Sequence, residues 1–119
     1  MADSILKFQT RGQVAVARVT IPQIVHPAEL EMLGRELHEF LDTGQAGALV
    51  LDLSALEYLT SAALGALLNI HVHLKARGKG FAIVAASEMV VETLRHTRLQ
   101  EVLPVLPDVD SAVDAVSGA

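Results

Sequence analysis

The chain has 119 residues, of which 51% are hydrophobic and 19% are charged, and it contains no cysteine. This composition is too apolar for a disordered chain, and the lack of thiols excludes disulfides and cysteine-based metal or redox sites. The formal charge of −5 comes from 14 acidic and 9 basic residues scattered along the chain, and aromatic residues make up only 3%. Without a basic cluster or aromatic platforms, we expect no direct binding of nucleic acid.

The length of the chain fits one domain, so we expect residues 1–119 to form a single domain. The sequence has no uncharged run near the roughly 20 residues that cross a bilayer, which argues against membrane insertion. Its start contains an acidic residue, Asp3, and lacks a basic leader followed by an apolar stretch. We therefore expect a cytoplasmic protein.

A β-hairpin is expected at the start of the chain. Residues 4–8 and residues 13–19 have the composition of short strands, and residues 9–12 would form the turn between them. Gly12 suits a tight turn. In the second strand Val14 and Val16 alternate with alanines, so its two sets of side chains would face opposite sides of a sheet.

Residues 26–42 predict the first helix, with Pro27 at a position that helices tolerate and Gly44 just beyond the end. The apolar residues at helical spacing are Leu30, Leu33, Leu37, Phe40 and Leu41. Residues 47–53 then form a continuous apolar run of strand length, as is typical of a central strand covered on both faces.

The second helix is expected at residues 61–77, where Gly78 stops it. Its first two-thirds is apolar on almost all sides, which predicts a buried helix. Residues 81–86 predict another buried strand, and residues 87–97 predict an amphipathic helix capped by Ser87.

Residues 102–106 predict a short strand, and residues 108–116 predict a final helix that begins at Asp108 or Asp110. Strands and helices therefore alternate after the hairpin. This order predicts an α/β fold with about four helices and a mixed central sheet of about five strands, some of them parallel.

Motifs for enzymatic chemistry are missing from the sequence. Neither of the glycine-rich phosphate-binding motifs occurs, and there is no G-x-S-x-G to place a base beside Ser61. The five histidines include no H-E-x-x-H, and His71 and His73 stand two apart on a helix, so they would face different directions. We therefore expect no enzyme, no cofactor and no bound metal.

Asp52, at the end of an apolar strand, stands where the phosphoacceptor of a response-regulator receiver would stand. Such a receiver also needs an acidic pair after its first strand and a lysine after its last. This chain instead has RVTIPQ and VLPVLP at those places. We expect Asp52 to cap a turn with Ser54.

The segment ALVLDLSALEYLTSAALGALLNIHVHLKARGKGFAIV resembles the STAS domain family, and in particular the bacterial anti-sigma-factor antagonists. In that family a strand ending in Leu-Asp-Leu-Ser leads through a short apolar loop to Asp-Ser-Ser-Gly-Leu-Gly and a helix that ends in Lys-x-x-Gly. This chain keeps Leu51, Asp52, Leu53, Ser54, Leu64, Gly65, Leu67, Leu68, Leu74, Lys75 and Gly78. Residues 87–113 also resemble the C-terminal part of the family, so the resemblance implies a STAS-like fold over nearly the whole chain.

The resemblance implies a phosphorylation site. In the antagonists, a partner anti-sigma kinase phosphorylates a serine at the start of the second helix, and only the unphosphorylated form binds that partner. That serine falls on Ser61, with Thr60 as its cap or a second candidate acceptor; Thr60, Ala62 and Ala63 replace the family's neighbouring residues. Two interpretations stay open, because Thr60 or Ser61 would also serve simply as a helix cap.

The expected partner is an anti-sigma factor or related serine kinase, and the expected contact surface surrounds Ser61. It comprises Tyr58, Leu59, Thr60, Ser61, Ala62, Ala63 and Leu64, with His26 and Glu29 near the first helix as candidates for its rim. The alternative is a STAS subunit of a lipid-transport ABC complex, or another constitutive protein-binding module that needs no phosphorylation. The sequence makes no prediction of the oligomeric state.

Overall fold

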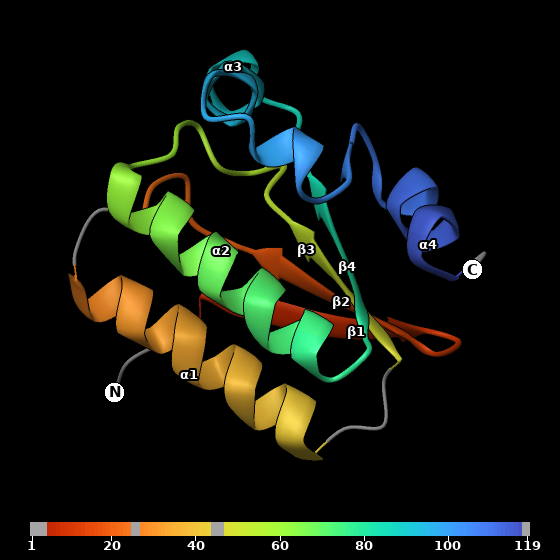
Figure 1. Cartoon of the computed structure of the whole chain (residues 1–119). Helices are drawn as coiled ribbons and strands as arrows, with labels where there is room; N and C mark the ends of the chain where they lie inside the picture. Colours follow the sequence, from red (N-terminus) through yellow and green to blue (C-terminus); the bar gives the residue numbers. More distant parts are fainter. Residues whose placement is uncertain (1–4, 25–26, 44–46, 118–119) are drawn as a thin grey trace.

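The described residues of the computed structural model, 5–24, 27–43 and 47–117, form one sheet with helices on both of its faces (Figure 1). The strands are β1 (Leu6–Arg11), β2 (Val14–Val19), β3 (Ala48–Asp52), β4 (Gly80–Val84) and β5 (Val105–Leu106). The helices are α1 (Pro27–Thr43), α2 (Ser61–Ala76), α3 (Glu88–His96), the short 3-10 helix η1 (Leu99–Glu101) and α4 (Val109–Ser117).

The strand order in the sheet is the order in the sequence, β1-β2-β3-β4-β5. β1 and β2 are antiparallel and form the N-terminal hairpin, whereas β2, β3, β4 and β5 are mutually parallel. The structure thus confirms the predicted α/β fold, with a mixed five-stranded sheet, four α-helices and the hairpin.

The hairpin turn is tighter than predicted. β1 continues to Arg11, and Arg11 pairs with Val14, so only Gly12 and Gln13 lie between the strands. Gly12 has a φ of +62°, which a glycine adopts without the steric cost that other residues have. The prediction that residues 9–12 form the turn was wrong, because Gln9, Thr10 and Arg11 continue the pairing with β2 although all three are polar and exposed.

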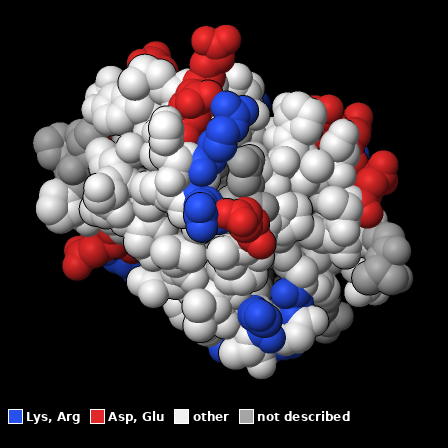
Figure 2. Space-filling view, turned by 45° about the horizontal axis from the view of Figure 1, so that its top comes forward, with Lys and Arg blue, Asp and Glu red and all other residues white. Residues whose placement is uncertain are grey.

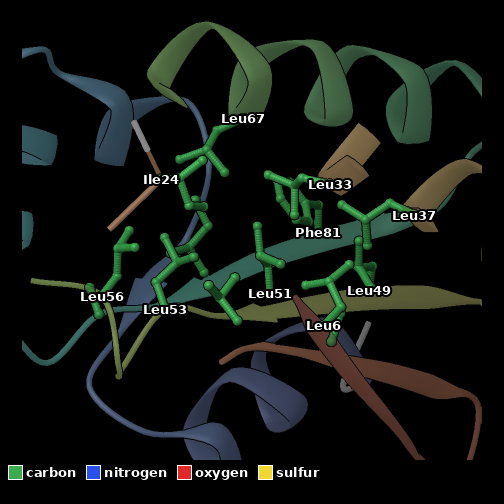
Figure 3. Packing of buried hydrophobic residues seen from close by; sticks show 14 of the residues in the cluster. Leu6, Ile24, Leu33, Leu37, Leu49, Leu51, Leu53, Leu56, Leu67 and Phe81 are labelled. Carbon is green, nitrogen blue, oxygen red and sulfur yellow. The ribbon is translucent and has the colours of Figure 1, made fainter. Parts of the chain in front are cut away.

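The sheet separates two apolar clusters. The larger one lies between the sheet and α1 and α2, where leucines from both helices meet side chains from β3 and β4 (Figure 3). Its most deeply buried members include Leu33, Leu37, Leu49, Leu51 and Leu67. The smaller cluster, with Val16, Val50 and Val84, is covered by α4 through Ala112. The predicted alternation of β2 and the two-sided burial of β3 are both confirmed.

The C-terminal part departs from the prediction at the short strand, and the structure decides between the two predicted caps of the last helix. Residues 102–104 are not a strand: η1 precedes them, and β5 is limited to Val105–Leu106. Pro104 has no N–H to donate, which limits the strand on that side. Asp108, not Asp110, caps α4, since its Oδ1 accepts a hydrogen bond from the N–H of Ser111 at 2.7 Å.

The start of α1 and the end of α2 agree with the sequence signals. α1 begins at Pro27, and Gly78, with a φ of +71°, follows the last turn of α2. Gly44 and the side chains of Phe40 and Leu41 lie outside the described part of the chain. Among the described helices, none has the length and apolar character needed to span a bilayer.

Candidate functional site

Thr60 is the residue that caps α2. Its backbone is extended, with φ −87° and ψ 164°, and its Oγ1 accepts a hydrogen bond from the N–H of Ala63 at 3.1 Å. Its carbonyl accepts the first helical hydrogen bond, from the N–H of Leu64 at 3.0 Å. This is the geometry of an N-cap threonine, and it leaves Ser61 free of that structural task.

Ser61 is the first residue of α2 and is exposed. Within the described part of the chain its hydroxyl has no hydrogen-bond partner, and the backbone N–H groups of Ser61 and Ala62 have no acceptor. Free N–H groups and the positive end of the helix dipole favour an anion at such a position. The first turn of α2 contains no acidic side chain that would occupy it.

The loop before α2 is held by two other segments. The N–H of Glu57 donates to the carbonyl of Pro22 at 2.8 Å, and the hydroxyl of Tyr58 donates to Oε1 of Gln23 at 3.2 Å. Ser87 Oγ donates to the carbonyl of Glu57 at 2.9 Å. Ser87 is at the N-cap of α3 as predicted, but its side chain fixes this loop and makes no cap hydrogen bond.

The turn that leads into this loop has the predicted form. Oδ1 of Asp52 accepts a hydrogen bond from the N–H of Ser54 at 2.9 Å, and the N–H of Leu56 donates to the carbonyl of Leu53 at 2.9 Å. Asp52 is only 6% exposed. The prediction that Asp52 caps a turn with Ser54 is confirmed, and this turn directs the chain from the end of β3 toward α2.

The residues around Ser61 differ in their exposure. Ala62 is exposed, whereas Leu59 and Leu64 are half-buried and pack against the main core. Tyr58 is also half-buried. Ala63 was expected on the contact surface, but it is 3% exposed, because the third position of the helix points toward the sheet. Its side chain therefore belongs to the core, not to the surface.

His26 and Glu29 were predicted at the rim of the contact surface, and only Glu29 can be placed. His26 lies outside the described residues. Glu29 is half-buried in the first turn of α1. α1 and α2 lie side by side and run in the same direction, so their starts lie at the same end of the molecule (Figure 1). Glu29 is thus on the side of the molecule where the rim was expected.

An exposed apolar row on α2 was missed by sequence reasoning. Gly65, Leu68 and Val72 follow Ser61 at spacings of three and four residues, and Leu68 and Val72 are 40% and 63% exposed. The apolar residues on nearly all sides of α2 predict a buried helix, but α1 and the sheet cover only part of it. The sequence signal for this surface is that α2 has more apolar faces than α1 and the sheet can cover. An apolar face that is left uncovered often marks a binding surface.

Met89, on α3, is a second exposed apolar side chain, at 63%, and it lies two residues beyond the Ser87 that contacts the loop. The face in Figure 2, which brings α3 and its surroundings forward, is mainly uncharged, with acidic and basic side chains that adjoin one another in its upper middle and others toward its edges. Exposed apolar side chains therefore lie both on α2, at Leu68 and Val72, and on α3, at Met89.

Comparison with known proteins assigns the family. A family model described as the STAS domain matches residues 7–112, and the chain therefore belongs to the STAS domain family. An anti-sigma factor antagonist from Mycobacterium paratuberculosis is 26% identical, with a TM-score of 0.81, over 93% of this chain and 92% of that one. A Thermotoga maritima protein is 22% identical, with a TM-score of 0.80, over 93% of each chain.

The Bacillus protein SpoIIAA has the same fold at lower identity. The unphosphorylated form of this anti-sigma factor antagonist is 16% identical, with a TM-score of 0.77, over 96% of this chain and 97% of that one. The phosphorylated form is 13% identical, with a TM-score of 0.68, over 93% and 98%. Among these solved structures of the same fold are therefore proteins that antagonise anti-sigma factors.

Proposed function

We propose that this protein is an anti-sigma-factor antagonist of the partner-switching kind, and that phosphorylation of Ser61 controls its binding to a kinase-like anti-sigma factor. It acts as a cytoplasmic, non-catalytic binding module. The observation that carries the proposal is the division of roles between two neighbours: Thr60 caps α2, while the hydroxyl of Ser61 is exposed and unbonded within the described residues. The hydroxyl of Ser61 is therefore more accessible to a kinase than the hydroxyl of Thr60, which is half-buried and bonded to the N–H of Ala63.

Phosphorylation at this position is compatible with an intact fold. The phosphate would meet the free N–H groups of Ser61 and Ala62 and the positive end of α2, an interaction worth roughly 0.3–1 kcal/mol at an exposed site. The modification therefore does not need to unfold α2 in order to act.

The same phosphate would oppose docking of a partner. It adds about −1.5 to −2 charges beside exposed Ala62 and half-buried Leu59, on a surface where an apolar partner face would have to desolvate it. Residues 54–62 contain no lysine or arginine to neutralise it, and Glu57 is their one charged residue. Docking is therefore favoured without the phosphate and disfavoured with it.

Intact-mass spectrometry of the protein from its native cells, with and without phosphatase and followed by site mapping, tests the modification. We expect one phosphate, on Ser61. A protein that stays unmodified across growth conditions would contradict the switch and favour the alternative of a constitutive module, such as a subunit of a lipid-transport ABC complex.

Affinity capture with variants tests the binding consequence. Wild type and Ser61→Ala should retain a kinase-like ATPase from the lysate, whereas Ser61→Asp should lose it while keeping its thermal midpoint. Ser117→Asp is the matched control, because Ser117 is exposed at the end of α4, which lies on the other face of the sheet. Equal capture by Ser61→Asp and wild type, or capture of an ATPase-permease assembly, would count against the proposal.

A further inference from the structure

A second cluster of functional groups lies at the other end of the α1 and α2 pair. His38 and Asp42 are four residues apart on α1 and so share one face of that helix. His73 comes from the last turn of α2, and its ring lies 4.3 Å from that of His38, centroid to centroid. One ligand atom from each of the three residues lies within 4.8 Å of the others.

The Nε2 atom of His73 is a second observation that indicates a ligand at this cluster. It is shielded from solvent and has no hydrogen-bond partner, although a buried polar nitrogen normally has one. Burial, together with the positive charges of Arg77 and His38, lowers the pKa of His73 below its ordinary value of 6.5. The unpartnered Nε2 is therefore available to give a lone pair to a cation.

We propose that His38, Asp42 and His73 bind a divalent transition-metal ion, with Zn²⁺ as the expected ion. Two imidazoles and one carboxylate suit Zn²⁺ and its neighbours far better than Ca²⁺ or Mg²⁺, which prefer oxygen ligands alone. Three protein ligands leave the fourth position of a tetrahedral site to water. The site is independent of Ser61 and of the function proposed for it.

Two helix ends favour a cation here, against the opposing positive charge of Arg77, and a groove gives the ion access. The C-terminal ends of α1 and α2 lie together here, since the two helices run in parallel (Figure 1), and both dipoles present their negative ends. His38 and His73 also line a groove of about 240 Å³ between the helices, which Leu30, Ala66 and Ile70 help to form. An ion from solvent can reach the two rings along this groove.

Binding requires small movements of side chains. In a tetrahedral Zn²⁺ site with bonds of about 2.0–2.1 Å, ligand atoms lie about 3.3 Å apart, closer than the 4.8 Å limit of the metal-free cluster. His38 and Asp42 are exposed, so their rotation can close this gap without moving the helices. Oδ1 of Asp42 pairs with Arg77 at 2.8 Å, and the second oxygen of the carboxylate is the one left for the metal.

The test is metal binding to untagged, chelator-treated protein, measured by calorimetry with Zn²⁺ and by the visible absorption of bound Co²⁺. We expect one ion per chain and a thermal midpoint that rises with Zn²⁺ concentration. His38→Gln, Asp42→Asn and His73→Gln should each weaken binding at least about tenfold. His96→Gln, an exposed histidine on α3, is the matched control and should bind as wild type does.

Two outcomes would overturn the proposal. One is the absence of stoichiometric binding. The other is binding that survives the substitutions in the cluster, or that falls as much in His96→Gln as in His38→Gln, which would indicate adventitious histidine binding only. Because His38 is exposed, its substitution leaves the fold intact and keeps the test decisive even where His73→Gln is destabilised.

Discussion

The two ends of α2 have opposite chemistry on one continuous helix. At the start, Thr60 caps the helix, Ser61 is exposed, and free N–H groups favour an anion. At the end, His73 meets His38 and Asp42 from α1, where two helix C-termini favour a cation. About twelve residues, or roughly 18 Å of helix, separate Ser61 from His73.

The backbone dipole sets which sign of charge each end of α2 favours, and the side chains at each end decide which ligand or modification uses it. A hydroxyl at the positive end can be phosphorylated, and imidazoles at the negative end can hold a metal. The two sites share the helix but no residue, so a change at one end should leave the other end unaffected unless it disturbs the helix itself.

The largest expected effect comes from the buried side of α2, where a substitution should damage both ends at once. Leu67 is 2% exposed and points from α2 toward the sheet (Figure 3). Leu67→Ala should lower the free energy of unfolding by about 2–5 kcal/mol, measured by urea denaturation, because it leaves a cavity. Leu68→Ala is the control: Leu68 is 40% exposed, and its truncation should change stability by less than about 0.5 kcal/mol. Equal losses would contradict the orientation of α2.

A smaller effect, confined to the start of the helix, is expected from Thr60→Ala. The substitution removes the hydroxyl that accepts from the N–H of Ala63 and should cost roughly 0.5–2 kcal/mol of unfolding free energy. Thr60→Ser keeps the hydroxyl and should stay close to wild type. Binding of Zn²⁺ at the other end should be unchanged in both variants, and a loss of Zn²⁺ affinity in Thr60→Ala would show that the two ends are coupled.

Gly65→Ala should stabilise the protein, in contrast to the two substitutions above. A Cβ atom at Gly65 would meet nothing within 4 Å, so alanine should raise the unfolding free energy by roughly 0.5–1 kcal/mol. Its methyl group would stand one turn beyond Ser61 on the exposed face and should weaken partner docking. Gly34→Ala, on α1, also has open space and should stabilise without weakening docking. Unchanged docking by Gly65→Ala would place the partner surface elsewhere.

The subtlest change is Arg77→Gln at the end of the helix. Arg77 lowers the pKa of Asp42 by a direct hydrogen bond, and its charge adds to burial in lowering the pKa of His73. Without Arg77 both pKa values should rise toward their ordinary values, which NMR titration of the metal-free protein would detect for His73. At pH 7.5, where His73 stays neutral, Zn²⁺ affinity should increase by up to about fivefold, because a competing cation is gone.

The sign of the accompanying pH dependence follows from the lowered pKa of His73. As the pH falls through about 6.5, the unfolded chain takes up this proton before the folded chain does. The folded state therefore loses stability on acidification below that pH, and the loss should shrink in Arg77→Gln as the pKa of His73 rises. Thermal midpoints between pH 5 and pH 7.5 would measure this difference, and an unchanged pH profile would contradict the role of Arg77.

Local signals in the sequence were sufficient for most of the fold. The alternation in β2, the apolar run of β3 and the glycine after α2 each depend on neighbouring residues, and each is confirmed by the structure. The length of β1 and the short β5 were mispredicted. Polar residues extend β1 on a partly exposed face, and the loss of a donor at Pro104 limits β5.

The surroundings of the two candidate sites could not be predicted from the sequence, because they depend on contacts between residues that are far apart in the chain. The sequence could place Ser61 at the start of a helix, but not decide whether Thr60 or Ser61 caps it, because both residue types fit. The spacing of His71 and His73 along one helix predicted no metal site. His38 and His73 are 35 positions apart in the chain and meet only because α1 and α2 pack side by side.

The placement of α4 has a consequence for how the protein is made. α4 covers the face of the sheet that carries Val16, Val50 and Val84, and it follows every strand in chain order. During synthesis the strands can add to the sheet one after another, because their spatial order is their order of emergence from the ribosome. Until α4 emerges, however, the face of the nascent sheet that carries these valines stays uncovered and prone to aggregation, so we expect the growing chain to depend on chaperones until α4 is made.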